Sequence, residues 1–66
     1  MVTVKIIELI GTSKKSWEDA VQEAVTKTAS KIHNIKGVHV VSFKAKVENN
    51  KISEYKTNIK IAFLVD

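Results

Sequence analysis

The sequence predicts an α+β domain whose elements follow the order strand, helix, strand, strand. Three observations support this fold class: a Val- and Ile-rich segment at residues 2–10, an apolar stripe of helical period from about residue 14 to 33, and a period of two from residue 38 onward. A chain of 66 residues allows one domain. We therefore expect residues 1–66 to form one unit in which the helix packs on the sheet.

The first strand is predicted to end at a turn formed by Gly11, Thr12 and Ser13. This turn is not a phosphate-binding loop, because it lacks both the glycine spacing and the Gly-Lys-Ser/Thr ending of such loops. It is interpreted as a strand-to-helix connection that carries a helix cap.

The helix is predicted from about residue 14 to 33. Ser13 and Ser16 are both candidate N-caps, and Asp19 lies three residues after Ser16, which approximates a capping box. Asn34 is expected to adopt the left-handed conformation after the helix. The apolar stripe, with spacings of three and four, consists of Trp17, Ala20, Val21, Ala24, Val25, Thr28, Ile32 and Ile35. Trp17 is interpreted as a core or interface residue of this stripe.

The two remaining strands are predicted to form a hairpin, with one face toward the helix (the inner face) and one away from it (the outer face). On the first strand the expected inner residues are His39, Val41, Phe43, Ala45 and Val47, and the expected outer residues are Val38, Val40, Ser42, Lys44 and Lys46. On the second strand the expected inner residues are Tyr55, Thr57, Ile59, Ile61, Phe63 and Val65.

The register of the hairpin is predicted from the parity of these faces. A two-residue Asn-Asn turn would place one apolar face outside, whereas a three-residue loop at 49–51, which pairs Glu48 with Ile52, keeps both faces inside. In that register Lys46 faces Glu54, which is favourable.

Lys44 then faces Lys56, and this like-charged pair requires a counter-charge from elsewhere. Lys44, Lys46, Lys56 and Lys60 are all expected on the outer face, where they are candidate contacts for an anion.

The amino-acid composition argues against nucleic-acid binding and against the common metal sites. The net charge is +4, but all eleven basic residues are lysines, and the absence of arginine argues against a nucleic-acid partner. There is no cysteine, which excludes disulfides and thiolate metal sites, and His33 and His39 are too few and too poorly spaced for zinc. No carboxylates cluster as a strong calcium site requires, so no metal ligands are assigned.

Association is the remaining source of stability for so small a core, which predicts a closed homo-oligomer. The apolar residues expected on the outer face, Val38, Val40, Ala62 and Leu64, are candidate subunit contacts.

No nucleophile is placed beside a base, so no enzymatic activity is expected. No apolar stretch approaches the ~20 residues of a membrane span and no signal peptide is evident, so a cytoplasmic protein without a membrane partner is expected.

Four short motifs resemble the dodecin family, and the resemblance covers essentially the whole chain. They are Gly11-Thr12-Ser13, Ser16-Trp17-Glu18-Asp19-Ala20, Tyr55-x-Thr57 and Ala62-Phe63. The resemblance implies a three-stranded antiparallel sheet wrapped around one helix, assembly into a hollow homododecamer, and storage or quenching of stacked flavins, either FMN or riboflavin, between subunits.

Two flavin-contacting positions of the family are substituted. Gly37 stands where flavin-binding dodecins have a stacking tryptophan, and Lys56 stands where they have a glutamine that hydrogen-bonds the ring edge. Both substitutions argue against the usual mode of flavin binding. Members that resemble this chain in lacking that tryptophan include some associated with calcium. Two hypotheses remain: a shell that sequesters a small molecule, either a flavin in an altered mode or another anion, and a structural or anion- or metal-ion-binding dodecamer without flavin.

Overall fold

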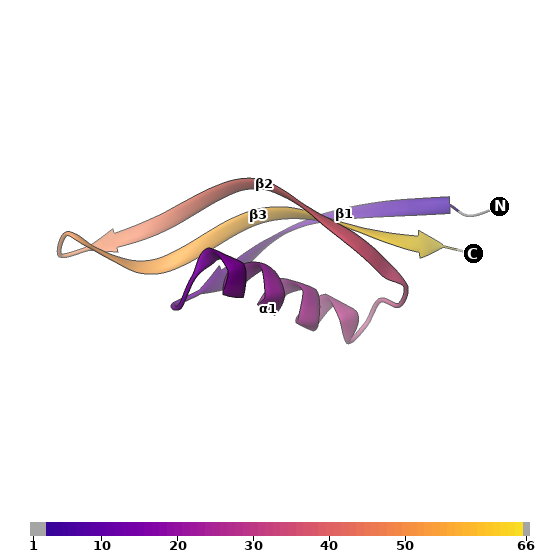
Figure 1. The fold of residues 1–66 in the computed structure, drawn as a ribbon, viewed down its shortest axis with the longest axis horizontal. Coiled ribbons are helices and arrows are strands. Elements are labelled where there is room, and N and C mark those ends of the chain that lie inside the picture. The colour runs from indigo at the N-terminus through magenta and orange to yellow at the C-terminus, as the bar shows by residue number, and fades with distance from the viewer. Residues whose placement is uncertain (1–2, 66) are drawn as a thin grey trace.

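A three-stranded antiparallel sheet with one helix on its inner face makes up the computed structural model, which describes residues 3–65 (Figure 1). The elements are β1 (Thr3–Ser13), α1 (Trp17–Ala29), β2 (Ile35–Glu48) and β3 (Lys51–Val65). The sheet order is β1-β3-β2, so β3 is central and pairs antiparallel with both neighbours. The predicted α+β class and the β-α-β-β order are confirmed. The turn predicted at residues 11–13 is wrong, because these residues continue β1 and pair with residues 55–57 of β3.

The helix begins and ends inside its predicted range. Ser16 is the N-cap, and its hydroxyl accepts a hydrogen bond from the backbone N–H of Asp19 at 3.0 Å. Ser13, the other candidate, donates its hydroxyl to a carboxylate oxygen of Asp19 at 2.6 Å and accepts from the N–H of Lys15 at 2.9 Å. The helix ends at Ala29, and Asn34, with φ of 63°, has the left-handed conformation predicted for it.

The core lies where the helix stripe meets β1 and β3. The buried apolar side chains are Ala20, Ala24, Ile59 and Ile61. The half-buried ones packed around this core include Ile7, Leu9, Val21, Val25, Ile35 and Val40. Gly11 is buried opposite the helix, where a Cβ atom would lie 2.3 Å from the carbonyl oxygen of Ala20. The close approach of β1 to α1 therefore depends on the absence of a side chain at Gly11.

The register of β2 shifts between Val40, which pairs with Ile59, and Ser42, which pairs with Asn58. Val41 is the extra residue of this β-bulge. Because strand side chains alternate, one extra residue moves every side chain beyond it to the opposite face. The faces predicted for β2 therefore reverse on the N-terminal side of Val41.

This reversal corrects three predicted positions. Val38 and Val40 lie on the inner face, where they pair with the buried β3 residues Ile61 and Ile59, and Val40 packs against the core. His39 lies exposed on the outer face, not the inner one. The predicted outer apolar surface therefore loses both valines. It keeps Ala62 and Leu64, and it gains the β1 residues paired with them, Ile6 and Val4, which are 58% and 56% exposed.

The hairpin turn also differs from the prediction. It is a two-residue turn in which Asn49 and Asn50 both have positive φ, 52° and 63°, and Glu48 pairs with Lys51. Positive φ at both positions is the type I′ geometry that asparagine tolerates. The predicted loop at 49–51 is wrong because the extra residue lies inside β3, at Ser53.

Because Ser53 is an extra residue in β3, the residue pairs between the bulge and Val41 are the predicted ones. Lys46 pairs with Glu54 and Lys44 with Lys56, as predicted. The Ser53 hydroxyl donates to the Lys46 carbonyl at 3.3 Å, which holds the bulge in place.

Thr57 is fully buried on the inner face between Gly11 and Phe43, and its hydroxyl has no hydrogen-bond partner within residues 3–65. A buried hydroxyl without a partner is unfavourable, whereas valine has the same shape and no polar group. We expect Thr57→Val to raise the free energy of unfolding by about 1 kcal/mol. Urea denaturation at fixed protein concentration measures this, with Thr12→Val on the exposed side of β1 as the control. A destabilised Thr57→Val protein would contradict the prediction.

Candidate functional site

Lysine side chains gather on the outer face of the β2–β3 hairpin. Lys44 and Lys46 of β2 lie beside Lys56 of β3, with Lys44 directly paired to Lys56. We call these three residues the lysine cluster. Thr12 of β1 flanks Lys56 on its other side. In this register the three lysines share one face of the sheet, as predicted.

Glu54 provides the counter-charge that the Lys44–Lys56 pair requires. Its carboxylate lies 3.9 Å from the Lys56 ammonium, and it is also the direct partner of Lys46. The Lys56 and Glu54 side chains are 43% and 32% exposed, so water screens their attraction and the pair contributes little stability. One carboxylate against three ammonium groups leaves the cluster with an excess of positive charge.

Lys60 lies apart from the cluster. It is four residues from Lys56 along β3, which is about 13 Å in a strand. It stands between Glu8 of β1 and His39 of β2 on the outer face. Because Glu8 is directly opposite, the charge of Lys60 is balanced locally.

Gly37 lies on the outer face opposite Ala62, six residues along β3 from Lys56. That separation is about 20 Å in a strand. A Cβ atom at Gly37 would meet nothing within 4 Å, so the position borders open space. The two flavin positions of the family therefore do not meet within one chain, although they share a face.

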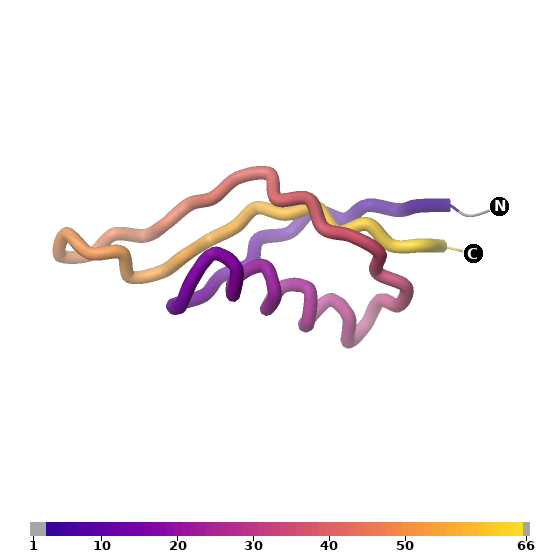
Figure 2. The backbone as a smooth tube through the Cα atoms, viewed as in Figure 1, coloured from indigo at the N-terminus to yellow at the C-terminus, as the bar shows by residue number. Residues whose placement is uncertain are grey.

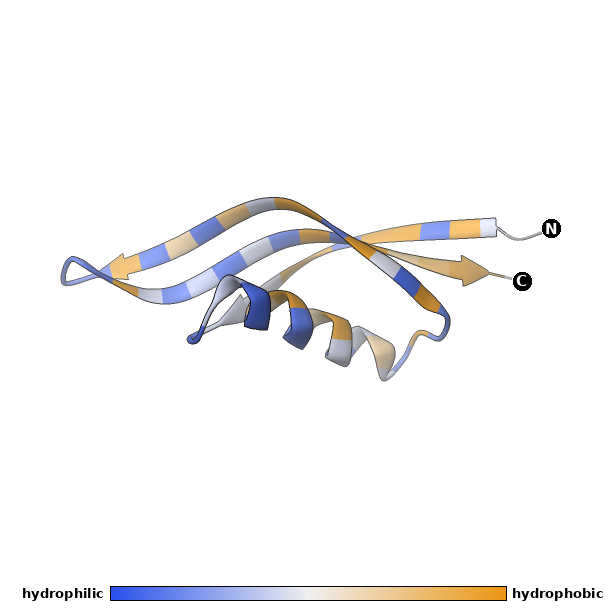
Figure 3. Cartoon of the chain, viewed as in Figure 1, coloured by the Kyte–Doolittle hydropathy of each residue, from blue (hydrophilic) through white to orange (hydrophobic). Residues whose placement is uncertain are grey.

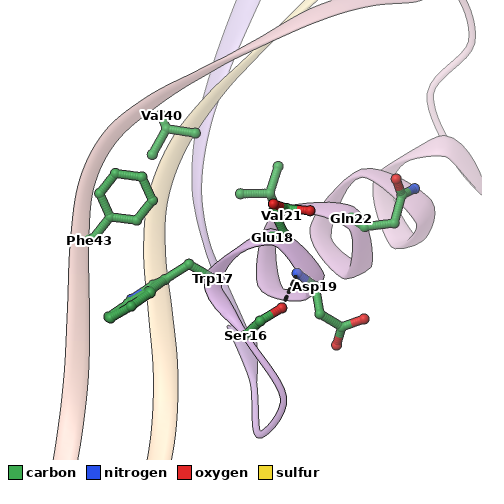
Figure 4. Close-up of a pocket in the computed structure, with 8 residues that line it drawn as sticks. All are labelled: Ser16, Trp17, Glu18, Asp19, Val21, Gln22, Val40 and Phe43. Carbon is green, nitrogen blue, oxygen red and sulfur yellow. Dashed lines mark hydrogen bonds between the residues drawn. The ribbon is translucent and has the colours of Figure 1, made fainter.

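A second candidate site, an open groove of about 1070 Å³, lies on the inner face between the start of α1 and β2 (Figure 4). Val21 and Glu18 on the helix side face Val40 and Phe43 on the strand side. The complete lining is Ser16, Trp17, Glu18, Asp19, Val21, Gln22, Val40 and Phe43.

Trp17 closes one end of this groove and joins the helix to the hairpin. Its ring packs edge-on against Tyr55 at 4.8 Å and Phe43 at 6.0 Å between centroids. Its indole N–H donates to the Lys44 carbonyl at 2.9 Å. The groove was not predicted from the sequence. The signal for it was that Phe43 and Tyr55 were expected on the inner face of the hairpin, toward Trp17 in the first turn of the helix.

Residues 3–65 contain no group of three or more His, Asp or Glu side chains arranged to hold a metal ion. Over the same residues, α1 is too short and too polar to cross a bilayer.

The family model described as Dodecin matches residues 3–66. The chain belongs to the dodecin family. A calcium dodecin of Mycobacterium tuberculosis (strain ATCC 25618 / H37Rv) is 30% identical to this dodecin over 63 residues, which are 96% of this chain and 89% of that protein.

Solved dodecin structures have the same fold. The dodecin of Streptomyces coelicolor superposes with a TM-score of 0.95 at 22% identity, covering 98% of this chain and 93% of that one. The dodecin of Streptomyces davaonensis gives 0.93 at 20% identity, with 98% and 96% covered. The structure of the calcium dodecin of Mycobacterium tuberculosis gives 0.83 at 31% identity, with 97% and 91% covered. The resemblance seen in the four short motifs is thereby confirmed.

Proposed function

We propose that this dodecin assembles into a closed homododecamer that binds and stores a small anionic molecule and does not turn over a substrate. The observation that carries the proposal is the lysine cluster, in which Lys44, Lys46 and Lys56 face one carboxylate on an open sheet face. In a symmetric assembly this charge repeats around each axis and strengthens the local positive potential.

Assembly is supported by the small size of the core. Only four apolar side chains are buried in the described chain: Ala20, Ala24, Ile59 and Ile61. On the outer face Val4 and Ile6, which pair with Leu64 and Ala62, are 56% and 58% exposed, and Ile10 farther along β1 is 63% exposed. Covering these side chains with further copies supplies the burial that one chain lacks. A cysteine-free sequence fits the cytoplasm, where we place the assembly.

Flavin is the ligand that the family implies. The residues of this chain suit the phosphate of a flavin but not its ring. A stacked ring requires an aromatic face, but Gly37 offers none, and Trp17 lies on the inner face beneath the hairpin. A flavin phosphate, in contrast, suits the ammonium groups of the lysine cluster, which act as point charges. Charge recognition is therefore favoured over ring stacking.

Calcium, which one relative is named for, fits the described residues poorly. Calcium takes six to eight oxygen ligands, whereas residues 3–65 contain no group of three or more side chains that could hold a metal ion, and Glu18 and Asp19 are the only carboxylates adjacent in sequence there. Asp19 is already engaged by the Ser13 hydroxyl at 2.6 Å. No calcium site is proposed for the single chain.

Titration of FMN and riboflavin, followed by quenching of flavin fluorescence, tests the proposal. We expect FMN to bind at least tenfold more tightly than riboflavin at low salt, and the preference to weaken at high salt because ions screen the lysine charges. Lys56→Gln and Lys44→Gln should each reduce it, and Lys60→Gln, outside the cluster, is the matched control. Tight riboflavin binding without salt dependence would refute charge selection. Binding of neither flavin, nor of inorganic phosphate, would favour a purely structural shell.

A further inference from the structure

Another groove, of about 450 Å³, lies between the end of α1 and β1, and we call it the helix-end groove. In Figure 2 the last turns of α1 lie toward the end of the sheet where β1 starts and β3 ends. The volume of the groove is within the range of roughly 300–1,000 Å³ that small-molecule sites occupy. Its lining is Ile7, Lys27, Thr28, Ser30, Lys31 and Ile32.

The floor of the helix-end groove is apolar. Ile7 packs against the core, and both Ile7 and Ile32 are half-buried, so each keeps some apolar surface at the groove. The hydrocarbon stems of Lys27 and Lys31 extend this surface, because a lysine side chain can lie along apolar neighbours while its ammonium group stays in water. An aliphatic chain placed on this floor would be partly removed from water, which is favourable.

Lysines surround the floor. Lys27 and Lys31 are exposed and lie four residues apart at the end of the helix, and Lys5 lies two residues before Ile7 on the same face of β1. In Figure 3 the start of β1 is apolar with a hydrophilic break, where the sequence has Lys5. The ion pair found within residues 3–65 belongs to the β2–β3 hairpin, so none of these lysines has a carboxylate of the described chain within 4 Å. Glu23, the nearest carboxylate along the helix, is not part of the groove lining.

The carbonyl groups at the end of α1 are already occupied. A helix end disfavours an anion when its last carbonyl oxygens are free. Here the Lys27 carbonyl accepts hydrogen bonds from the Ser30 hydroxyl at 2.7 Å and from the Ser30 N–H at 3.3 Å. The Thr28 carbonyl accepts from the N–H groups of Lys31 at 3.0 Å and Ile32 at 2.9 Å. The ammonium groups therefore dominate the charge at the groove.

We propose that the helix-end groove binds a free aliphatic carboxylate, with its chain over Ile7 and Ile32 and its carboxylate between the ammonium groups of Lys27 and Lys31. The site is separate from the lysine cluster, which lies on the outer face of β2 and β3. It therefore does not depend on the anion storage proposed above. A single chain suits this groove better than a membrane surface does, because the groove is concave and its apolar floor is narrow.

NMR titration of octanoate into the protein, with isotope-labelled isoleucine methyl groups, tests the site. We expect the Ile7 and Ile32 methyl signals to shift until the site is saturated. The signals of Ile10 and Ile52, exposed on other surfaces, should not move. Octanoate should bind at least about tenfold more tightly than butyrate, which lacks most of the chain, and than octanol, which lacks the charge.

The double variant Lys27→Gln with Lys31→Gln should weaken octanoate binding at least about tenfold. Lys14→Gln with Lys15→Gln removes the same charge from exposed positions before the helix and is the matched control. Circular dichroism of both variants checks that the helix is retained.

Four outcomes would overturn the proposal. They are unshifted Ile7 and Ile32 signals, equal shifts of the control isoleucines, equal binding of octanol and octanoate, and an unchanged affinity of the Lys27 and Lys31 double variant. Shifts at Ile7 and Ile32 that are produced by vesicles of anionic phospholipid, but not by octanoate, would overturn it in favour of a lipid surface.

Discussion

Replacing Gly11 with alanine is expected to destabilise the protein by roughly 3 kcal/mol, the upper end of what overpacking costs. The new methyl group would lie 2.3 Å from the carbonyl oxygen of Ala20 and 3.1 Å from the Cβ of Ala24. The nearest of these atoms belongs to the helix backbone, so no flexible side chain can move aside. The helix must instead shift away from β1, which loosens the contacts that bury Ala20 and Ala24.

Gly37→Ala is the matched control for Gly11→Ala. A Cβ at Gly37 meets nothing within 4 Å, and neither glycine has positive φ, so the two substitutions differ chiefly in available space. Urea denaturation followed by circular dichroism compares them at one fixed protein concentration, because the proposed assembly would make stability depend on concentration. We expect Gly37→Ala to change the free energy of unfolding by less than about 0.5 kcal/mol. Equal effects of the two substitutions would contradict the packing described for Gly11.

The double variant Gly37→Trp with Lys56→Gln is expected to increase riboflavin affinity by at least tenfold, about 1.4 kcal/mol. The tryptophan supplies a stacking face worth about 1–3 kcal/mol by analogy with nucleobase stacking. The glutamine amide both donates and accepts hydrogen bonds, whereas the lysine ammonium only donates. A Cβ atom at Gly37 would meet nothing within 4 Å in the single chain, so the position has room for the start of a side chain.

This gain should depend on assembly. Positions 37 and 56 lie about 20 Å apart along β3 in one chain, so they can form one site only when they come from different copies. Fluorescence titration of the assembled double variant, and of each single variant, measures the effect. A double variant that assembles yet leaves riboflavin unbound would show that these positions do not form the flavin site.

The element order and the helix cap could be predicted because their signals are local. Ser16 is followed three residues later by Asp19, and the stripe through Ala20 and Ala24 keeps one period throughout, so cap and buried face coincide with the structure. The family resemblance was also predictable, since its motifs are contiguous in sequence.

The faces of β2 could not be predicted because a β-bulge leaves no mark in the composition. Val40 and Val41 are both apolar, so a reversal of phase between them cannot be seen in the hydrophobic pattern. The bulge at Ser53 was hidden in the same way, and parity reasoning placed its extra residue in the turn. The partners predicted for Lys44 and Lys46 were nevertheless correct. One extra residue between Lys46 and Glu54 gives the same pairing whether it lies in the turn or in β3.

The lysine cluster could be predicted from alternation alone, since Lys44 and Lys46 lie within the unbulged part of β2. The groove beside Trp17 could not. It exists because a 13-residue helix covers only part of a long hairpin, and the relative placement of helix and hairpin is a tertiary property.

Sedimentation velocity of the unmodified protein at micromolar concentration is the direct test of assembly. We expect one species many times heavier than the 7.4 kDa chain, without a significant monomer fraction. A stable, folded monomer would contradict the proposed assembly, because the apolar side chains of Val47, Ile52 and Ile6, which are 61%, 48% and 58% exposed in the single chain, would then remain exposed to water in the functional protein.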